Sequence, residues 1–214
     1  MHASSLRHLP ILDIGCGTGG TLAGAPCAGA GIDRSLDALR LCLERGQRFV
    51  AQADAAHLPF ADVSFSGALL LDVLYHRAVP DPVAVLREAH RVIAPGGHVI
   101  VNVPAYNWLR SSHDEAIHTE RRFTRPQLRA LMTAAGFQVI RATYWNTLLF
   151  PAAATIRLLR RNARRESSDL ADSRPGWTST VASAVFSCER TLLRVCDLPF
   201  GLSILAVGNK ALTR

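Results

Sequence analysis

Short apolar runs alternate with amphipathic stretches over the first two thirds of the chain. A buried parallel strand is a continuous apolar run, whereas a helix on a sheet carries an apolar stripe at helical spacing. The runs that fit strands are residues 9–15, 28–33, 49–53, 63–71, 98–103, 137–144 and 202–207. The stretches that fit helices are residues 36–45, 82–93 and 126–135, with a shorter one after Gly20. This alternation predicts an α/β fold with a doubly wound, mostly parallel sheet of seven strands.

Cap and turn residues stand where these elements should begin and end. Ser35 can cap the helix at 36–45, and Pro82 follows Asp81 at the start of the helix at 82–93. Thr124 precedes the helix at 126–135 in the same way. Residues 95–97, Pro-Gly-Gly, predict a turn before the fifth strand.

The last third of the chain departs from this alternation. Residues 148–159 are almost wholly apolar, residues 166–176 are polar, and residues 178–198 again have a helical pattern. We therefore expect a helical pair before the final strand. The expected organisation is a core at 1–145, a helical insertion at 146–200, and a last strand at 201–214 that completes the core.

A glycine-rich turn follows the first predicted strand. Glycine lets a backbone approach a ligand closely, and the helix that follows offers unpaired N–H groups. Gly15, Gly17 and Gly20 match G-x-G-x-x-G, which also occurs in NAD-binding proteins. Asp33, at the end of the second strand, suits a ribose diol. Asp13 would repel a pyrophosphate next to this turn, but it suits a cationic aminoacyl group.

Three further motifs follow in order. Asp54 and Ala55 come after the third strand, Leu71 and Asp72 end the fourth, and the turn at 95–97 follows the next helix. Together with the glycine-rich turn, these motifs resemble the class I S-adenosylmethionine (SAM)-dependent methyltransferases of the type 11 kind. The resemblance covers about residues 9–144 and returns at the last strand. It implies a Rossmann-like fold, SAM as cofactor and S-adenosylhomocysteine (SAH) as product, with no metal.

The resemblance also assigns the cofactor contacts by position. The implied contacts are Asp13, Gly15, Cys16 and Gly17 around the methionine part, Asp33 and Arg34 at the ribose, Asp54 and Ala55 at the adenine, and Leu71 and Asp72 below the sulfonium.

The loop after the fifth strand lies near the substrate in that family. Methyl transfer needs mainly proximity and orientation, and an O–H or N–H nucleophile can also need a base. The candidates in the loop are His113 and His118 as base, Asp114 to orient one of them, Arg121 and Arg122 for an anionic acceptor, and Tyr106 and Trp108 as further acceptor contacts. The alternative is that these residues hold a surface loop together or cap the next helix.

Composition and charge narrow the picture. The 214 residues are 49% apolar and 19% charged, which is typical of a globular chain. Of the net charge of +7, residues 1–145 carry +2 (14 Arg minus 12 acids) and residues 146–214 carry +5 (10 basic residues minus 5 acids). The basic stretch at 148–165 could pack on the sheet or cover the acceptor, form a homodimer interface, or lie on an anionic membrane surface. It lacks interleaved aromatic residues, so we expect no nucleic-acid partner.

No apolar run is long enough to span a membrane, and no signal peptide is evident, so we expect a cytoplasmic protein, with peripheral membrane contact as the alternative. The expected function is methyl transfer from SAM to a small molecule through an O- or N-nucleophile, and an anionic or lipid-like acceptor also fits. One alternative is a non-catalytic SAM-binding or partner protein that has lost its acceptor site, because few residues precede the first strand. The other is an NAD-dependent oxidoreductase.

Overall fold

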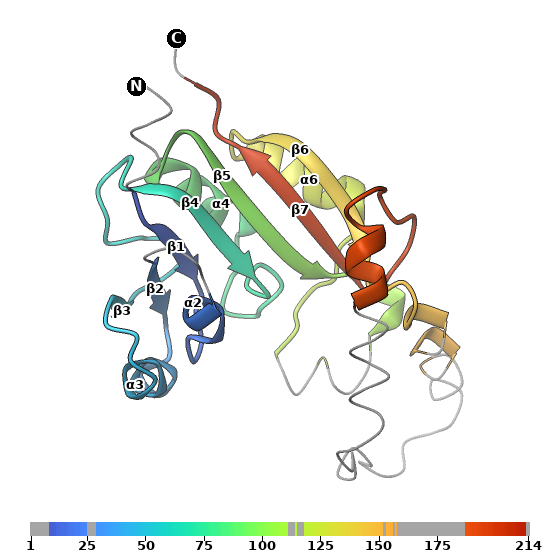
Figure 1. Ribbon diagram of the computed structural model, residues 1–214, viewed down its shortest axis with the longest axis horizontal. Coiled ribbons are helices and arrows are strands. Elements are labelled where there is room, and N and C mark those ends of the chain that lie inside the picture. The colour runs from blue at the N-terminus through green and yellow to red at the C-terminus, as the bar shows by residue number, and fades with distance from the viewer. Residues whose placement is uncertain are drawn as a thin grey trace.

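The computed structural model describes residues 9–24, 29–110, 114, 118–151, 153–155, 157 and 187–212. Seven strands form one sheet in the order β3-β2-β1-β4-β5-β7-β6 (Figure 1). The strands are β1 Ile11–Ile14, β2 Gly29–Asp33, β3 Val50–Gln52, β4 Phe65–Leu71, β5 Ile93–Pro104, β6 Gln138–Trp145 and β7 Ser203–Asn209. The helices are α2 Gly20–Gly24, α3 Leu36–Glu44, α4 Pro82–Val92, the short 3-10 helix η1 Asn107–Leu109, and α6 Arg125–Ala134. The predicted fold class is confirmed.

Only β7 runs against its neighbours. It pairs antiparallel with both β5 and β6, whereas β1, β2, β3, β4 and β5 pair in parallel. Strands β1, β2, β4, β5 and β6 therefore all end at the same edge of the sheet. In a doubly wound sheet, this carboxyl edge is where ligands bind.

The helices begin where the sequence predicts, for local reasons. The Ser35 side chain accepts a hydrogen bond from the Ala38 N–H, and Asp81 accepts one from the Val83 N–H. At α6, the Gln127 side chain reaches back to the Thr124 N–H at 2.8 Å. These contacts satisfy donors that have no partner within the first helical turn.

The start of β5 differs from the prediction of a turn at 95–97 followed by a strand from 98. Strand pairing already begins at Ile93, and the register against β4 shifts between Phe65 and Gly67. A side chain at Gly97 could not fit, since its Cβ would lie 2.4 Å from the Ser66 carbonyl oxygen. Glycine therefore lets the start of β5 stay close to β4 across the register shift, and the chain does not form the predicted turn.

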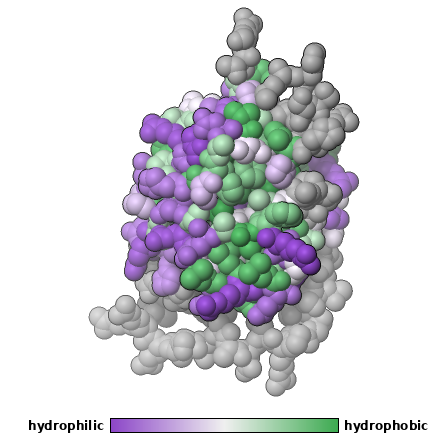
Figure 2. Space-filling model, turned by 90° about the vertical axis from the view of Figure 1, so that its left-hand side faces the viewer, coloured by the Kyte–Doolittle hydropathy of each residue, from purple (hydrophilic) through white to green (hydrophobic). Residues whose placement is uncertain are grey.

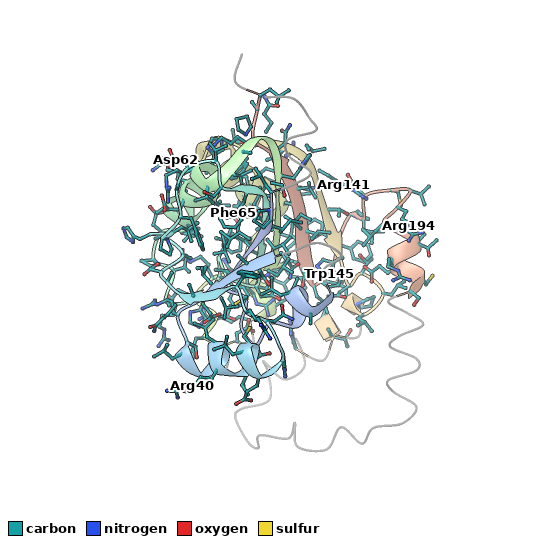
Figure 3. All side chains as sticks on the ribbon, turned by 60° about the vertical axis from the view of Figure 1, so that its left-hand side comes forward. Arg40, Asp62, Phe65, Arg141, Trp145 and Arg194 are labelled. Atoms are coloured by element: carbon teal, nitrogen blue, oxygen red, sulfur yellow. The ribbon has the colours of Figure 1, made fainter. Side chains whose placement is uncertain are left out.

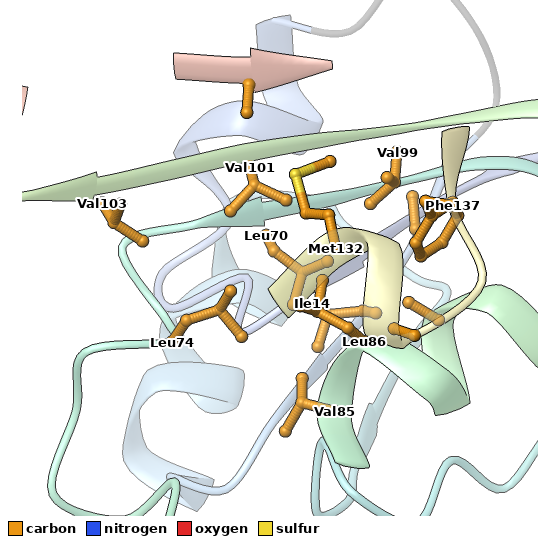
Figure 4. Packing of buried hydrophobic residues seen from close by; sticks show 14 of the residues in the cluster. Ile14, Leu70, Leu74, Val85, Leu86, Val99, Val101, Val103, Met132 and Phe137 are labelled. Carbon is orange, nitrogen blue, oxygen red and sulfur yellow. The ribbon is translucent and has the colours of Figure 1, made fainter. Parts of the chain in front are cut away.

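The two faces of the sheet are covered unequally. Helices α4 and α6 lie on one face, where Leu70, Val99 and Val101 are fully buried (Figure 4). On the other face, α2 and α3 lie over the β1–β3 half (Figure 1), and no helix of the described chain crosses β4, β5 and β7. Leu205 and Ile100 on that face remain half-exposed. The main hydrophobic core is therefore on the α4–α6 side.

The β3 end of the molecule also carries apolar side chains at its surface. Figure 2 views this end, where apolar residues gather in the middle of the face and polar residues border them. Leu36, Leu41 and Leu43 of α3 and Phe49 before β3 are all exposed. The buried side of α3 is narrow and consists of Leu39 and Cys42. This end therefore has its own small core with Cys16.

Much of the predicted insertion at 146–200 lies outside the described residues, so its helical pair and the three-part division stay predictions. Within the predicted helix at 178–198, the described helical stretch is 187–192, and the chain is no longer helical after it. Leu198 instead forms a bridge with Tyr144, so the predicted end at 198 is wrong. Buried Glu189 accepts a hydrogen bond from the Thr147 N–H at 2.8 Å and ties this stretch to the end of β6. In the part of the chain that the structure describes, no helix is long and apolar enough to cross a membrane.

Candidate cofactor and acceptor site

The glycine-rich turn joins β1 to α2 at the carboxyl edge. The N–H groups of Gly15 and Cys16 both donate to the Ile32 carbonyl, at 2.8 and 2.9 Å, and hold the turn against β2. Gly15 and Gly17 have φ angles of 77° and 55°, in the region that favours glycine. A Cβ at Gly15 would lie 2.5 Å from the Val73 side chain, whereas one at Gly17 would meet nothing within 4 Å. The turn is closed at Gly15 and open at Gly17, where a ligand has room.

Asp33, at the end of β2, reaches this turn. One carboxylate oxygen accepts from the Gly17 N–H at 2.9 Å, and the other accepts from the Ser35 N–H at 2.8 Å. The side chain therefore links the glycine turn to the start of α3. It remains only partly buried, so its oxygens are within reach of a polar ligand.

Asp13 lies deeper, at the end of β1. It is 2% exposed, and its Oδ2 atom has no hydrogen-bond partner among the described residues. Burial and the nearby charge of Asp33 raise the pKa of the Asp13 carboxyl to about 6. A buried, unsatisfied carboxylate is costly by itself and is stabilised by a cationic partner. This position therefore suits a ligand that carries positive charge.

Two residues predicted as cofactor contacts turn their side chains elsewhere. The Cys16 side chain is buried against Cys42 and Leu39, so only its backbone faces the turn. The Arg34 guanidinium donates to the Ala78 carbonyl at 3.1 Å and ties β2 to the loop after β4.

The predicted adenine contacts lie just after β3. The Asp54 side chain is exposed and accepts a hydrogen bond from the Ala56 N–H at 2.9 Å. Ala55 between them is buried. Among the described residues, the second carboxylate oxygen of Asp54 has no hydrogen-bond partner. It lies at the same end of the sheet as Asp33.

A chain of side-chain hydrogen bonds crosses the end of the sheet from β4 to β6. Asp72 follows the half-buried Leu71 and has a φ of 63°, a value that non-glycine residues seldom adopt. Its Oδ1 accepts from the Asn102 side-chain amide at 2.9 Å, and the Asn102 Oδ1 accepts from the Trp145 indole N–H at 2.8 Å. Asp72 is exposed at the edge, but the groups around its carboxyl partly desolvate it and raise its pKa, and the Asn102 hydrogen bond opposes that rise.

The loop after β5 contains a buried ion pair. The Arg122 guanidinium contacts the Asp114 carboxylate at 2.7 and 2.8 Å and donates to the Ala105 carbonyl at 2.9 Å. The side chains of Arg122 and Asp114 are only 6% and 1% exposed. This pair ties the described part of the loop together. The roles of Arg122 as an anion ligand and of Asp114 in orienting a base stay predictions.

The other polar candidates of the loop lie beside the segment that follows β4. The His118 ring packs edge-to-face on His76 with ring centres 5.8 Å apart, and burial followed by the charges of His118 and Arg34 lowers the pKa of His76. Arg121 donates to the Pro80 carbonyl at 3.3 Å. His113 lies outside the described residues. The described part of the loop therefore brings the His118 ring onto the ring of another histidine.

Tyr106 and Trp108 belong to an aromatic cluster at the carboxyl edge. Tyr106 stacks on Tyr144 with ring centres 5.2 Å apart, and Trp108 and Phe150 pack around it at about 6 Å. Phe150 also contacts Phe200, which precedes β7. Trp108 is 44% exposed, so the cluster presents an aromatic surface beside the end of β5.

Comparisons with known proteins agree with this geometry. Residues 12–101 match the model of the methyltransferase domain family. Over these residues the chain is therefore similar to methyltransferase domains. The match runs from β1 to β5 and includes the glycine turn, Asp33, Asp54 and Asp72.

Two relatives and one solved structure illustrate the range of this methyltransferase family. A tRNA (carboxymethyluridine(34)-5-O)-methyltransferase from Arabidopsis thaliana is 33% identical over 55% of this chain and 30% of its own length. An O-methyltransferase from Pyrenophora dematioidea is 28% identical over 61% of this chain and 54% of its own. The chain thus spans between about a third and about half of these relatives. A phosphoethanolamine N-methyltransferase 2 from Haemonchus contortus, solved with SAM, shares the fold (TM-score 0.61, 19% identity, 95% of this chain, 49% of that chain).

Sequence reasoning missed several residues at the β5–β6 part of this carboxyl edge. Asn102 carries a usable signal, because it is a polar residue near the end of an apolar strand. Trp145, Tyr144, Phe150 and Phe200 carry none, since aromatic residues in or near strands are normally core residues. Only the antiparallel return of β7 brings β6 and its neighbours to this edge.

Proposed function

We propose that this chain binds SAM at the β1–β2 end of the carboxyl edge and transfers its methyl group to a small molecule through an oxygen or nitrogen atom, releasing SAH. The observation that carries this proposal is Asp13. Its buried, unpartnered carboxylate oxygen lies directly before a glycine turn that is open at Gly17. A cationic aminoacyl group satisfies that oxygen, whereas the pyrophosphate of NAD would bring like charge to it.

Each cofactor residue has a role that its surroundings allow. Asp13 and the backbone of Gly15, Cys16 and Gly17 hold the methionine part, and Asp33 exchanges its Gly17 contact for the ribose hydroxyls. Arg34 supports the ribose end only through its backbone and its tie to Ala78.

The adenine and reaction ends follow along the same edge. The free carboxylate edge of Asp54 and the Ala55 N–H accommodate the adenine. Leu71 and Asp72 close the pocket below the sulfonium. When bound, SAM supplies an electrophilic methyl group, and the protein contributes mainly orientation and exclusion of water.

On the acceptor side, we propose that Tyr106 and Trp108 contact the acceptor through the aromatic cluster. Arg121 and His118 lie at its margin, and His113 stays a candidate base outside the described residues. We leave Arg122 and Asp114 out of the acceptor contacts because they bind each other.

Parallel calorimetric titrations with SAM, SAH and NAD test the cofactor. We expect micromolar binding of SAM and SAH and no binding of NAD. Asp33→Ala should weaken SAH binding by at least about tenfold, because one lost charged hydrogen bond costs about 1.5–3 kcal/mol. Asp37→Asn is the control, since Asp37 is an exposed carboxylate on α3 that pairs with Arg40 on the same helix. Binding of NAD alone, or equal SAH affinity in Asp33→Ala, contradicts the proposal.

The acceptor is sought with methyl-labelled SAM and pools of phenols, alcohols and amines, with bulk tRNA as a separate arm because one relative modifies tRNA. Methylation of small molecules alone supports the proposal, and methylation of tRNA alone overturns its acceptor class. SAH binding without turnover of any acceptor would favour a non-catalytic SAM-binding protein.

Residues 148–165 lie mostly outside the described residues, so their contact with a membrane surface and a role in a homodimer stay predictions. Co-sedimentation with anionic vesicles tests the first, and light scattering tests the second. A protein that stays in the supernatant as a monomer would exclude both.

A further inference from the structure

The hydrogen bonds between Asp72, Asn102 and Trp145 have only one consistent direction. An indole N–H is a donor only, so the Asn102 atom that faces Trp145 must be its oxygen. The Asn102 amide nitrogen therefore faces Asp72 and donates to its Oδ1 at 2.9 Å. The indole thus determines the orientation of the amide, and the amide holds the carboxylate.

The second oxygen of Asp72 is left for a ligand. Within the described ranges, Asp72 Oδ2 has no hydrogen-bond partner, and the side chain is exposed at the carboxyl edge. The backbone holds Asp72 at a φ of 63° through a hydrogen bond from its N–H to the Asn102 carbonyl at 3.1 Å. Strained backbone at a ligand edge persists only where the surroundings over-determine it.

We propose that Asp72 is the base of the methyl transfer, and that Asn102 and Trp145 are positioning residues that aim its free Oδ2 at an N–H or O–H group of the acceptor. This rests on the proposed function. The acceptor lone pair forms the new bond to the methyl carbon, and the carbon–sulfur bond breaks with its electron pair going to sulfur. The proton of the N–H or O–H passes to Asp72 Oδ2.

The charges around Asp72 are compatible with this role. Tyr75 is the titratable neighbour, and burial followed by the charge of Asp72 raises its pKa to about 12, so it stays neutral near pH 7. Burial and the Asn102 hydrogen bond act in opposite directions on the pKa of Asp72. Loss of that bond should therefore raise the Asp72 pKa and move the rise of activity with pH to a higher pH.

The first experiment needs no acceptor. Carbon-13 NMR of labelled aspartate carboxyls, with SAH bound, follows Asp72, and Asp72→Asn assigns its signal. Trp145→Phe keeps a ring but removes the N–H, so the Asn102 amide can rotate; Asn102→Asp removes the donor and adds a like charge. We expect the Asp72 pKa to rise in Trp145→Phe and to rise further in Asn102→Asp. An Asp72 signal that is unmoved in both variants overturns the proposal.

The second experiment measures turnover with an acceptor found in the pools. Asp72→Asn keeps the shape and tolerates a positive φ, so it should fold. We expect turnover to fall about 10²–10⁴-fold, as for loss of a general base, and to fall much more than SAH affinity, because SAH lacks the positive charge that Asp72 faces in SAM. Asp62→Asn is the control, because Asp62 lies at the opposite end of the sheet from Trp145 (Figure 3) and pairs with Arg91.

These measurements distinguish failure of the proposed function from failure of the proposed base. Loss of SAH binding in the wild type contradicts the proposed function itself. Normal SAH binding with turnover that survives in Asp72→Asn contradicts only the base, as does exclusive methylation of compounds that have no N–H or O–H.

Discussion

The proposed cofactor half and the proposed acceptor half of the carboxyl edge are built in different ways. The proposed cofactor half consists of one turn and single carboxylates at or just after the ends of β1, β2 and β3, and the side-chain contacts of Asp33 and Asp54 are to backbone N–H groups. The acceptor half consists of side chains that meet over long sequence distances, such as Trp145 with Asn102 and Tyr106 with Tyr144. We therefore expect the proposed cofactor half to tolerate most substitutions other than those of its glycines and acids. In the proposed acceptor half, loss of either side chain of a contacting pair should disturb the geometry.

The largest expected effect falls on the acceptor half. Arg122→Leu removes the guanidinium that pairs with the buried Asp114 carboxylate, and removing one partner of a buried pair costs about 3–5 kcal/mol. Urea unfolding should show this loss, while Arg77→Leu, which breaks an exposed pair with Glu120, should cost less than about 1 kcal/mol. Equal effects of the two substitutions would mean that the buried pair does not hold the loop.

A smaller effect of opposite sign is expected at Asp13 in the cofactor half. Its folded pKa is raised from 3.8 to about 6, so the folded protein binds the proton more tightly than the unfolded chain. Stability therefore falls as pH rises from about 4 to about 6 and then stays level, a loss of about 3 kcal/mol. Asp13→Asn should remove this slope and stabilise the ligand-free protein at pH 7 while weakening SAM binding. Unfolding at pH 4, 5, 6 and 7 measures the slope; an unchanged slope in the variant would contradict the assignment.

The smallest expected effect compares two glycines of the turn. Gly17→Ala places a residue at φ 55° with open space and should cost about 1–2 kcal/mol. Gly15→Ala adds a 2.5 Å approach to the Val73 side chain and should cost more. Thermal unfolding ranks the two in the ligand-free protein. In SAH titrations we expect the opposite order: relative to its loss of stability, Gly17→Ala should lose more SAH affinity than Gly15→Ala, because the open side of Gly17 faces the proposed ligand. A larger loss of SAH affinity in Gly15→Ala alone would contradict this.

Sequence patterns predicted the fold and the cofactor half to different degrees. Seven strands, three long helices and their capping residues follow from local apolar spacing and hydrogen-bonding side chains, which act within a few residues. The irregular start of β5 was missed because glycine at 96 and 97 is equally compatible with a turn and with close approach to β4. The roles of Asp13, Asp33 and Asp54 rest on their positions after strands, and they remain proposals for the titrations to test.

The order of the elements, the glycine turn and the acids at the ends of the strands can be predicted from the sequence, because each of these is encoded within one short segment. That Arg122 binds Asp114, that His118 packs on His76, and that Trp145 orients Asn102 against Asp72 is visible only in the folded chain. Such partners are chosen by packing of segments far apart in the chain. The local sequence around a basic or aromatic residue does not decide whether its side chain faces a ligand or the protein interior.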